Sequence, residues 1–271
     1  MGDQIDFAFR RLQPSILLLH ADIPHVIWGQ DAVEFCFGGP FNFYDELDLQ
    51  ILLPPSKIQE AVKLLAPSYS TMTCDDIDEE KMTVDKRLAC VDYTLAFRDR
   101  PDDFVRLKLL RQNTDTVPSH VLLISNTIFD YPLDDVVQVP LPLCPDLPFP
   151  SVPAIVGLMP VHIQKWFKAG FSRQSLSFIC ACRTLLESAI EFSFCEELDT
   201  VFSDVDQLPT RLKEMICGLD EHQKTYVYDF FPIGEPGGSS SDSDGDIVWP
   251  NGFTLPPIPR TDSQGANDPP E

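Results

Sequence analysis

VIWGQDAVEFCFGGPFNFYDELDLQILL, residues 26–53, contains the pattern from which the fold is predicted. Residues 24–29, which overlap the start of this stretch, are mostly apolar. They predict a short buried strand that ends in a turn at Gly29. Asp31 is expected to cap a short helix that runs to Phe37. Residues 47–53 alternate leucine with polar side chains until Ile51, which indicates a second strand. The stretch therefore predicts a strand, a helix and a strand in succession.

The flanking segments extend this pattern. Residues 8–21 give a helical signal that Pro14 splits. Ser56 is expected to cap a helix that runs through Leu65 and has one apolar face. Further strands are predicted at 88–97, 104–110 and 121–124. This order of elements predicts an α/β (α+β) fold, a mixed sheet flanked by helices.

The second half of the chain has a different composition. Eight prolines between residues 132 and 160 predict an extended connector. Apolar residues recur at helical spacing from Arg173 to Phe194, and a weaker helix is expected over 210–219. From residue 233 the chain is rich in glycine, serine, proline and acidic residues, a composition typical of disorder. We therefore expect an α/β domain at 1–160, a helical C-terminal part at 161–232 and a disordered acidic, proline-rich tail at 233–271.

The charge argues against several classes of partner. Forty-two acidic residues against 20 basic ones give a net charge of −22, which repels nucleic-acid phosphates and anionic membranes. No apolar run approaches the ~20 residues that are needed to span a bilayer. The first residues lack the basic and apolar regions of a signal peptide, so we expect a cytoplasmic chain, with the nucleus as the alternative. In either compartment the eight cysteines are expected to be thiols.

Three acidic residues form the candidate chemical site. Residues i and i+2 of a strand point the same way, so Glu46 and Asp48 are expected to project from one face. Asp92 is a lone acid within the apolar strand predicted at 88–97. Carboxylate oxygens are ligands that Mg²⁺ prefers, and three carboxylates can hold the two metals of phosphoryl chemistry. The alternative is that Glu46 and Asp48 protect a solvated strand edge and that Asp92 is an ordinary exposed residue.

These residues resemble the nucleotidyltransferase superfamily, and more closely the nucleotidyltransferase-like proteins of filamentous fungi. The superfamily pattern is an apolar strand, Gly-Gly or Gly-Ser opening a short helix, acid-x-acid on the next strand, and a third acid further on. The pattern is matched here by residues 26–30, by Glu46-Leu47-Asp48 and by Asp92. The prolines and helix after the acidic strand, and the proline-rich passage at 148–154, are similar to the fungal proteins.

The resemblance implies a nucleotidyltransferase-like domain at 1–160. Its reaction would be Mg²⁺-dependent transfer of a nucleotidyl group from a nucleoside triphosphate to an acceptor that the sequence does not name. Glu46 and Asp48 would ligate magnesium, and Asp92 would ligate the second ion or act as base on the acceptor. Gly29 and Gln30 would face the triphosphate.

Two residues depart from the superfamily pattern, and these departures are consistent with a second possible function. Gln30 stands where the second small residue of the glycine motif is usual, so the motif is degenerate at the phosphate cradle. Glu46 stands where aspartate is commoner, which moves a metal by about one methylene. Both changes are typical of a lineage that has lost catalysis. The alternative function is therefore an inactive protein of the same fold that binds a nucleotide or another protein.

Overall fold

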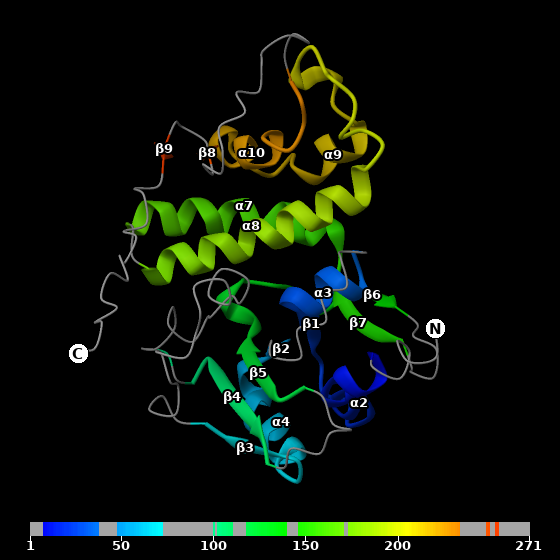
Figure 1. Cartoon of the computed structure of the whole chain (residues 1–271), viewed down its shortest axis with the longest axis vertical. Coiled ribbons are helices and arrows are strands. Elements are labelled where there is room, and N and C mark those ends of the chain that lie inside the picture. The colour runs from blue at the N-terminus through cyan, green and yellow to red at the C-terminus, as the bar shows by residue number, and fades with distance from the viewer. Residues whose placement is uncertain are drawn as a thin grey trace, which may run out of the picture.

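The computed structural model describes residues 8–37, 48–72, 100, 102–110, 118–139, 146–170, 173–233, 248–249 and 253–254. In the view of Figure 1 a five-stranded sheet lies below a pair of long helices, α7 and α8. The shorter helices α9 and α10 lie on the far side of that pair from the sheet (Figure 1). The polypeptide therefore forms an α/β part with a helical layer over it.

The sheet has the strand order β1-β2-β5-β4-β3. β1 (Val26–Trp28) pairs antiparallel with β2 (Leu49–Leu53), which pairs parallel with β5 (His120–Ser125). β4 (Phe104–Leu109) pairs antiparallel with both β5 and the edge strand β3 (Tyr69–Thr71). Every residue of β1 and β2 is buried, as expected for strands covered on both faces. The predicted mixed α/β sheet is confirmed.

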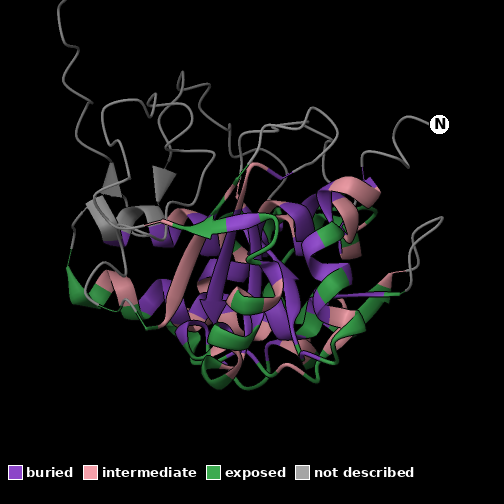
Figure 2. Cartoon of the chain, turned by 90° about the horizontal axis from the view of Figure 1, so that it is seen from below, coloured by how far each residue is buried: buried purple, intermediate pink, exposed green. Residues whose placement is uncertain are grey.

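Helices cover the two faces of the sheet because side chains alternate between the faces along each strand. On one face, residues such as Ile51 and Leu123 pack against α2 (Gln13–His20) and α4 (Ile58–Leu65). On the other face, Leu52 and Ile124 belong to a larger core with α7 (Val152–Ala169) and α8 (Arg173–Phe194). Figure 2 shows the resulting buried interior, with exposed residues at its rim.

Several predicted helices are confirmed, and one helix was missed. The N-terminal helical signal is interrupted at Leu12 and restarts as α2 with Pro14 in its first turn. The α8 helix has both its predicted ends, Arg173 and Phe194. The weaker C-terminal signal is the short α9 (Thr210–Met215), and α10 (Glu221–Tyr228) follows it. α10 was not predicted because its capping box, Asp220 with Gln223, precedes a mostly polar helix.

The extended connector predicted for residues 132–160 is wrong in its last part. α7 starts at Val152 and passes through residue 160, so the expected division at 160/161 falls inside a helix. Pro153 is tolerated because the first turn needs no intrahelical N–H donors, and the Ser151 hydroxyl accepts the N–H of Ala154 at 3.2 Å. Pro160 removes an interior hydrogen bond, yet it is buried among apolar neighbours that hold the helix together.

Two predicted helix caps are also wrong. The helix after β1 is α3 (Gly29–Phe35), so Asp31 lies inside its first turn rather than at its N-cap. The carboxylate of Asp31 is not available for capping because it is bound by a guanidinium, as described below. Ser56 is exposed within a 3₁₀ turn, Pro55–Lys57, which precedes α4, and its side chain makes no capping hydrogen bond.

A separate two-stranded sheet joins β6 (Val136–Val139) to β7 (Leu147–Pro150). β7 is buried and packs beside β1, but the two strands are not paired. The prolines of β7 explain this, because Pro148 and Pro150 offer no N–H toward a neighbouring strand. The residues predicted to be a connector thus contain a hairpin whose inner strand cannot extend the main sheet.

His25 is a structural histidine at the N-terminal edge of the core. One ring nitrogen, Nδ1, lies 2.8 Å from the carbonyl of Ile23, and Nε2 lies 2.6 Å from the hydroxyl of the buried Ser15. The carbonyl can only accept, so Nδ1–H donates to it and Nε2 accepts from Ser15. Burial lowers the pKa of His25 to about 4. The ring is therefore neutral in the folded chain at neutral pH.

Some expectations fall outside the described residues. The strand predicted at 88–97 lies there, as does most of the tail from 233, in which a short antiparallel pair is described, β8 (Val248–Trp249) with β9 (Phe253–Thr254). Among the described residues, no helix combines the length and the apolar character that crossing a membrane requires.

Candidate functional site

The candidate site lies where β1 ends and β2 begins. Because these strands are antiparallel, with Trp28 opposite Gln50, the glycine turn after β1 and Asp48 before β2 meet at one edge of the sheet. The start of β5 and the end of β4 reach the same edge, since His120 is paired with Lys108. We call this region the polar edge: Arg11, Gly29, Gln30, Asp31, Glu34, Asp48, Arg106, Lys108 and His120.

Asp48 is bound by a guanidinium. Arg106 of β4 places Nε 2.7 Å from Oδ2 and donates from Nη2 to Oδ1 at 2.9 Å. Both side chains are 14% exposed, so this ion pair, with its one hydrogen bond from Nη2, is largely shielded from water. The carboxylate predicted to ligate magnesium is therefore neutralised by a cation of the chain itself.

The space above Gly29 is filled by the side chain of Gln50. Gly29 has a φ of +63°, which favours glycine, and a Cβ built there would lie 2.7 Å from the Gln50 amide carbon. Gln50 is buried, and its Oε1 has no hydrogen-bond partner among the described residues. The same holds for the indole N–H of its cross-strand neighbour Trp28. The glycine turn thus faces a protein side chain where the predicted triphosphate would lie.

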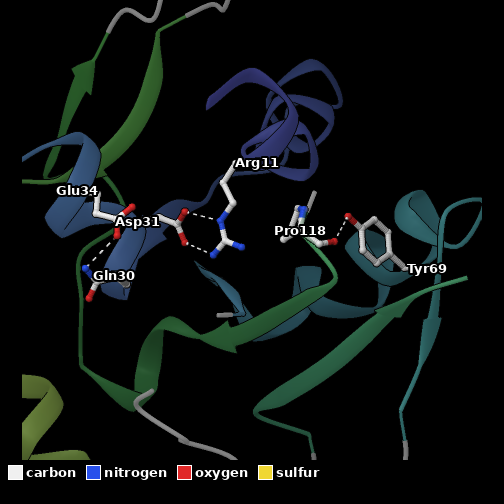
Figure 3. A network of polar contacts seen from close by, with 6 residues as sticks. All are labelled: Arg11, Gln30, Asp31, Glu34, Tyr69 and Pro118. Atoms are coloured by element: carbon white, nitrogen blue, oxygen red, sulfur yellow. Dashed lines mark hydrogen bonds and ion pairs between the residues drawn. The ribbon is translucent and has the colours of Figure 1, made fainter. Parts of the chain in front are cut away.

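Gln30 is turned along its own helix. Its amide donates to Glu34 Oε1 at 3.2 Å, one helical turn further on (Figure 3). Glu34 is buried, and burial raises its pKa to about 7, with Asp31 raising it further while Gln30 and the Arg11 guanidinium oppose the shift. Gln30 therefore supports a carboxyl group that changes charge near neutral pH.

A second ion pair lies behind this helix. Arg11 donates from Nε to Asp31 Oδ1 at 2.8 Å and from Nη2 to Oδ2 at 2.9 Å, and both side chains are almost fully buried (Figure 3). Burial by itself lowers the pKa of Arg11, but the neighbouring carboxylates, Asp31 above all, leave that pKa raised. The pair ties the N-terminal segment to α3.

Two cations of the polar edge, Arg106 and Lys108, affect the pKa of His120. Burial lowers the pKa of His120, and the charges of Arg106 and Lys108 lower it further, against the opposite effect of Asp48. Its Nδ1 lies 3.1 Å from the hydroxyl of Ser119. The imidazole at this edge is thus held toward its neutral form.

The structure brings together three of the five residues predicted for the site. Gly29, Gln30 and Asp48 lie at the polar edge, while Glu46 and Asp92 fall outside the described residues. Asp48 was predicted to lie within a strand at 47–53. In the structure it lies one residue before β2, which begins at Leu49. Sequence reasoning missed Arg11 and the other partners of these residues. Polar and apolar residues alternate over 104–109, which places Arg106 on the polar face of a strand. No sequence pattern near Arg106 indicates that it pairs with an acid 58 positions away.

The described residues do not fit a magnesium site. Both oxygens of Asp48 contact the Arg106 guanidinium, and a divalent cation there would have to displace that positive charge. Within the described ranges no three His, Cys, Asp or Glu side chains converge closely enough to hold a metal ion. The arrangement is that of two closed ion pairs beside a filled glycine turn.

Replacing Glu34 by glutamine is expected to stabilise the chain at high pH only. A raised pKa means that the contribution of Glu34 to stability is complete below its unfolded value of 4.5 and is lost as the pH rises through about 7. Glutamine keeps the neutral form, so the free energy of unfolding should exceed the wild-type value by about 2–3 kcal/mol at pH 8 and match it at pH 4.5.

Urea unfolding of both proteins between pH 4.5 and 8 measures this difference. His25 acts in the opposite direction in both, since its lowered pKa gives stability above pH 6.5 that is lost as the pH falls to about 4. Glu196→Gln, at an exposed site, is the matched control and should show a constant difference from the wild type. A constant difference for Glu34→Gln as well would contradict the account of Glu34.

The comparisons with known proteins give a distant structural similarity. No protein-family model matches the chain, and no curated protein matches it. Among solved structures, the chain is similar to an antigenic nucleotidyltransferase-like protein from Paracoccidioides brasiliensis, with 10% sequence identity and a TM-score of 0.41 over 86% of this chain and 94% of that one. At this distance the membership of this chain in a family stays a proposal.

Proposed function

We propose that this chain is a nucleotidyltransferase-like protein that does not transfer nucleotides and acts as a binding module. The observation that carries the proposal is the hydrogen-bonded ion pair of Arg106 with Asp48, the one predicted metal ligand among the described residues. A guanidinium is always charged and holds a carboxylate in a fixed planar geometry. Metal binding by Asp48 would have to break that pair in a site that is mostly shielded from water.

The glycine turn supports the same conclusion. In the family pattern, small residues at this turn let phosphate oxygens approach the backbone. Here the side chain of Gln50 occupies the space over Gly29, and Gln30 binds Glu34. Two separate features of the family's nucleotide site are therefore replaced by contacts within the chain.

Catalytic activity as a Mg²⁺-dependent nucleotidyltransferase is the rival function. It requires Arg106 to release Asp48 and requires Glu46 and Asp92 to converge on the same metal. Its substrates would be a nucleoside triphosphate and an acceptor. The magnesium ion would supply charge neutralisation of the phosphates.

Calorimetric titration of each nucleoside triphosphate into the full chain, with and without Mg²⁺, separates the two functions. We expect no binding that depends on magnesium and no release of pyrophosphate. Magnesium-dependent binding that Asp48→Asn abolishes, together with pyrophosphate release, would overturn the proposal. Asp102→Asn is the matched control, because Asp102 is an exposed acid in the turn before β4.

A double-mutant cycle on Asp48 and Arg106 tests the ion pair itself. Asp48→Asn and Arg106→Gln should each lower the free energy of unfolding, because each leaves a largely buried charge without its partner. The double variant should recover about 1–3 kcal/mol of the summed losses. Denaturant unfolding of the four proteins measures this coupling, and strictly additive losses would show that the pair contributes nothing.

A further inference from the structure

The outer edge of β6 has open hydrogen-bonding groups. Since Pro148 and Pro150 of β7 have no N–H, the hydrogen-bonded pairs of the β6–β7 ladder are Val137 with Phe149 and Val139 with Leu147. The intervening residues of β6, Val136 and Gln138, therefore point their N–H and C=O groups away from β7. In the part of the chain that the structure describes, these groups have no hydrogen-bond partner.

Within its own four residues, β6 lacks the devices that usually protect an edge strand. Edge strands are commonly blunted by proline, by lysine or by a bulge. β6 reads Val-Val-Gln-Val, with high strand propensity, no charge and an unbroken register against β7. Val137 is 44% exposed. The hairpin lies at the side of the molecule, where β7 packs against β1 and β6 is the outer strand (Figure 1).

The chain segment that contains β6 carries acidic side chains only. From residue 126 to residue 147 the chain contains four aspartates and no lysine or arginine. All four are exposed, and two of them, Asp134 and Asp135, immediately precede the strand. An approaching cationic segment is attracted by this charge, while a second copy of a chain with net charge −22 is repelled.

We propose that β6 is a docking site for a partner protein that adds an extended, lysine- or arginine-containing segment to the outer edge of the strand. Main-chain hydrogen bonds to Val136 and Gln138 hold the added strand, and the aspartates before β6 select for its positive charge. The site shares no residue with the polar edge. The inference therefore stands whether or not the chain transfers nucleotides.

The test uses the full chain and a fluorescein-labelled, end-blocked peptide of alternating lysine and valine as the probe. Fluorescence anisotropy should show saturable binding that weakens with salt. Methylating alternate backbone nitrogens of the probe keeps its charge and removes its donors, so affinity should fall at least about tenfold. A probe with glutamate in place of lysine should not bind.

Substitutions in the chain, rather than in the probe, test the same edge of β6. Gln138→Pro removes an N–H that is not used in the β6–β7 ladder and should abolish probe binding, whereas Gln138→Val keeps that N–H and should bind normally. Asp134→Asn combined with Asp135→Asn should weaken binding and flatten its salt dependence; Asp102→Asn, far along the chain, should do neither. Should Gln138→Pro fail to fold, the methylated probe decides alone.

Amide hydrogen exchange supplies the direct readout. The amides of Val136 and Gln138 should exchange fast in the free chain and become protected with the probe, while that of Val137 is protected in both. Absent binding, or equal binding of the methylated probe, would overturn the proposal. Sedimentation showing a dimer that Gln138→Pro dissociates would also overturn it, because the edge would then belong to a second copy.

Discussion

Replacing Asp31 by asparagine is expected to lower the free energy of unfolding by about 3–5 kcal/mol. Asp31 and Arg11 form a bidentate pair whose side chains are only 3% and 5% exposed. Removing the carboxylate leaves a guanidinium that cannot lose its proton, buried without its partner. Burying an unpaired charge is far more costly than losing the attraction between two exposed ones.

Two comparisons make this prediction specific to the buried charge. Arg11→Met combined with Asp31→Leu replaces the pair by apolar side chains and should be clearly more stable than Asp31→Asn. Glu60→Gln breaks the exposed pair with Lys57 on the turn into α4 and should cost less than about 1 kcal/mol. Chemical denaturation of the four proteins measures the differences. Equal costs for Asp31→Asn and Glu60→Gln would contradict the account.

The second large effect is expected at Trp28. This fully buried side chain packs β1 against the segment that follows β5, with its ring centroid 4.9 Å from that of Phe129 and 5.0 Å from that of Tyr131. Truncation to alanine removes these contacts and leaves a cavity in the larger core, so Trp28→Ala should cost about 3–5 kcal/mol.

Trp28→Phe separates packing from hydrogen bonding. Because the indole N–H has no acceptor within the part of the chain that the structure describes, we expect phenylalanine to lose no hydrogen bond and to keep most of the aromatic contact. Its cost should stay below about 1.5 kcal/mol. Thermal unfolding followed by circular dichroism measures both variants. A cost for Trp28→Phe close to that of Trp28→Ala would show that the N–H has a partner.

The sequence predicts those elements whose signal is local and periodic. The α8 helix has both predicted ends because its apolar residues repeat at helical spacing over six turns, about 22 residues. β1 follows from a short apolar run, and β2 follows from the alternation of leucine with polar residues that leads into Ile51. The same local reasoning failed for α7, because it used the number of prolines and not their positions in the helix. Pro153 lies in the first turn, where proline is tolerated. Pro160 is buried, and residues beside it in α7 pack in the larger core.

The candidate site was predictable only in part because its decisive contacts are not local. The resemblance implied that Gly29 and Asp48 share one site, but a strand, helix and strand pattern does not by itself predict the antiparallel pairing of β1 with β2 that brings them to one sheet edge. The partner of Asp48 is 58 positions away on β4, and that of Asp31 is 20 positions away before β1. Asp31 was therefore interpreted as a helix cap, the commonest role of an aspartate at that position. Only the fold shows that it binds Arg11 instead.

In this structure Arg106 occupies both carboxylate oxygens of Asp48, and we expect it to keep a metal ion from binding there. A titration of the full chain with Mn²⁺ and a nucleoside triphosphate, followed by NMR, tests this most directly, since a bound Mn²⁺ broadens the signals of nearby nuclei. The account predicts that the amide signals of Leu49 and His120, on either side of Asp48, broaden no more than those of exposed acidic turns elsewhere. Saturable broadening confined to Leu49 and His120, and removed by Asp48→Asn, would contradict it.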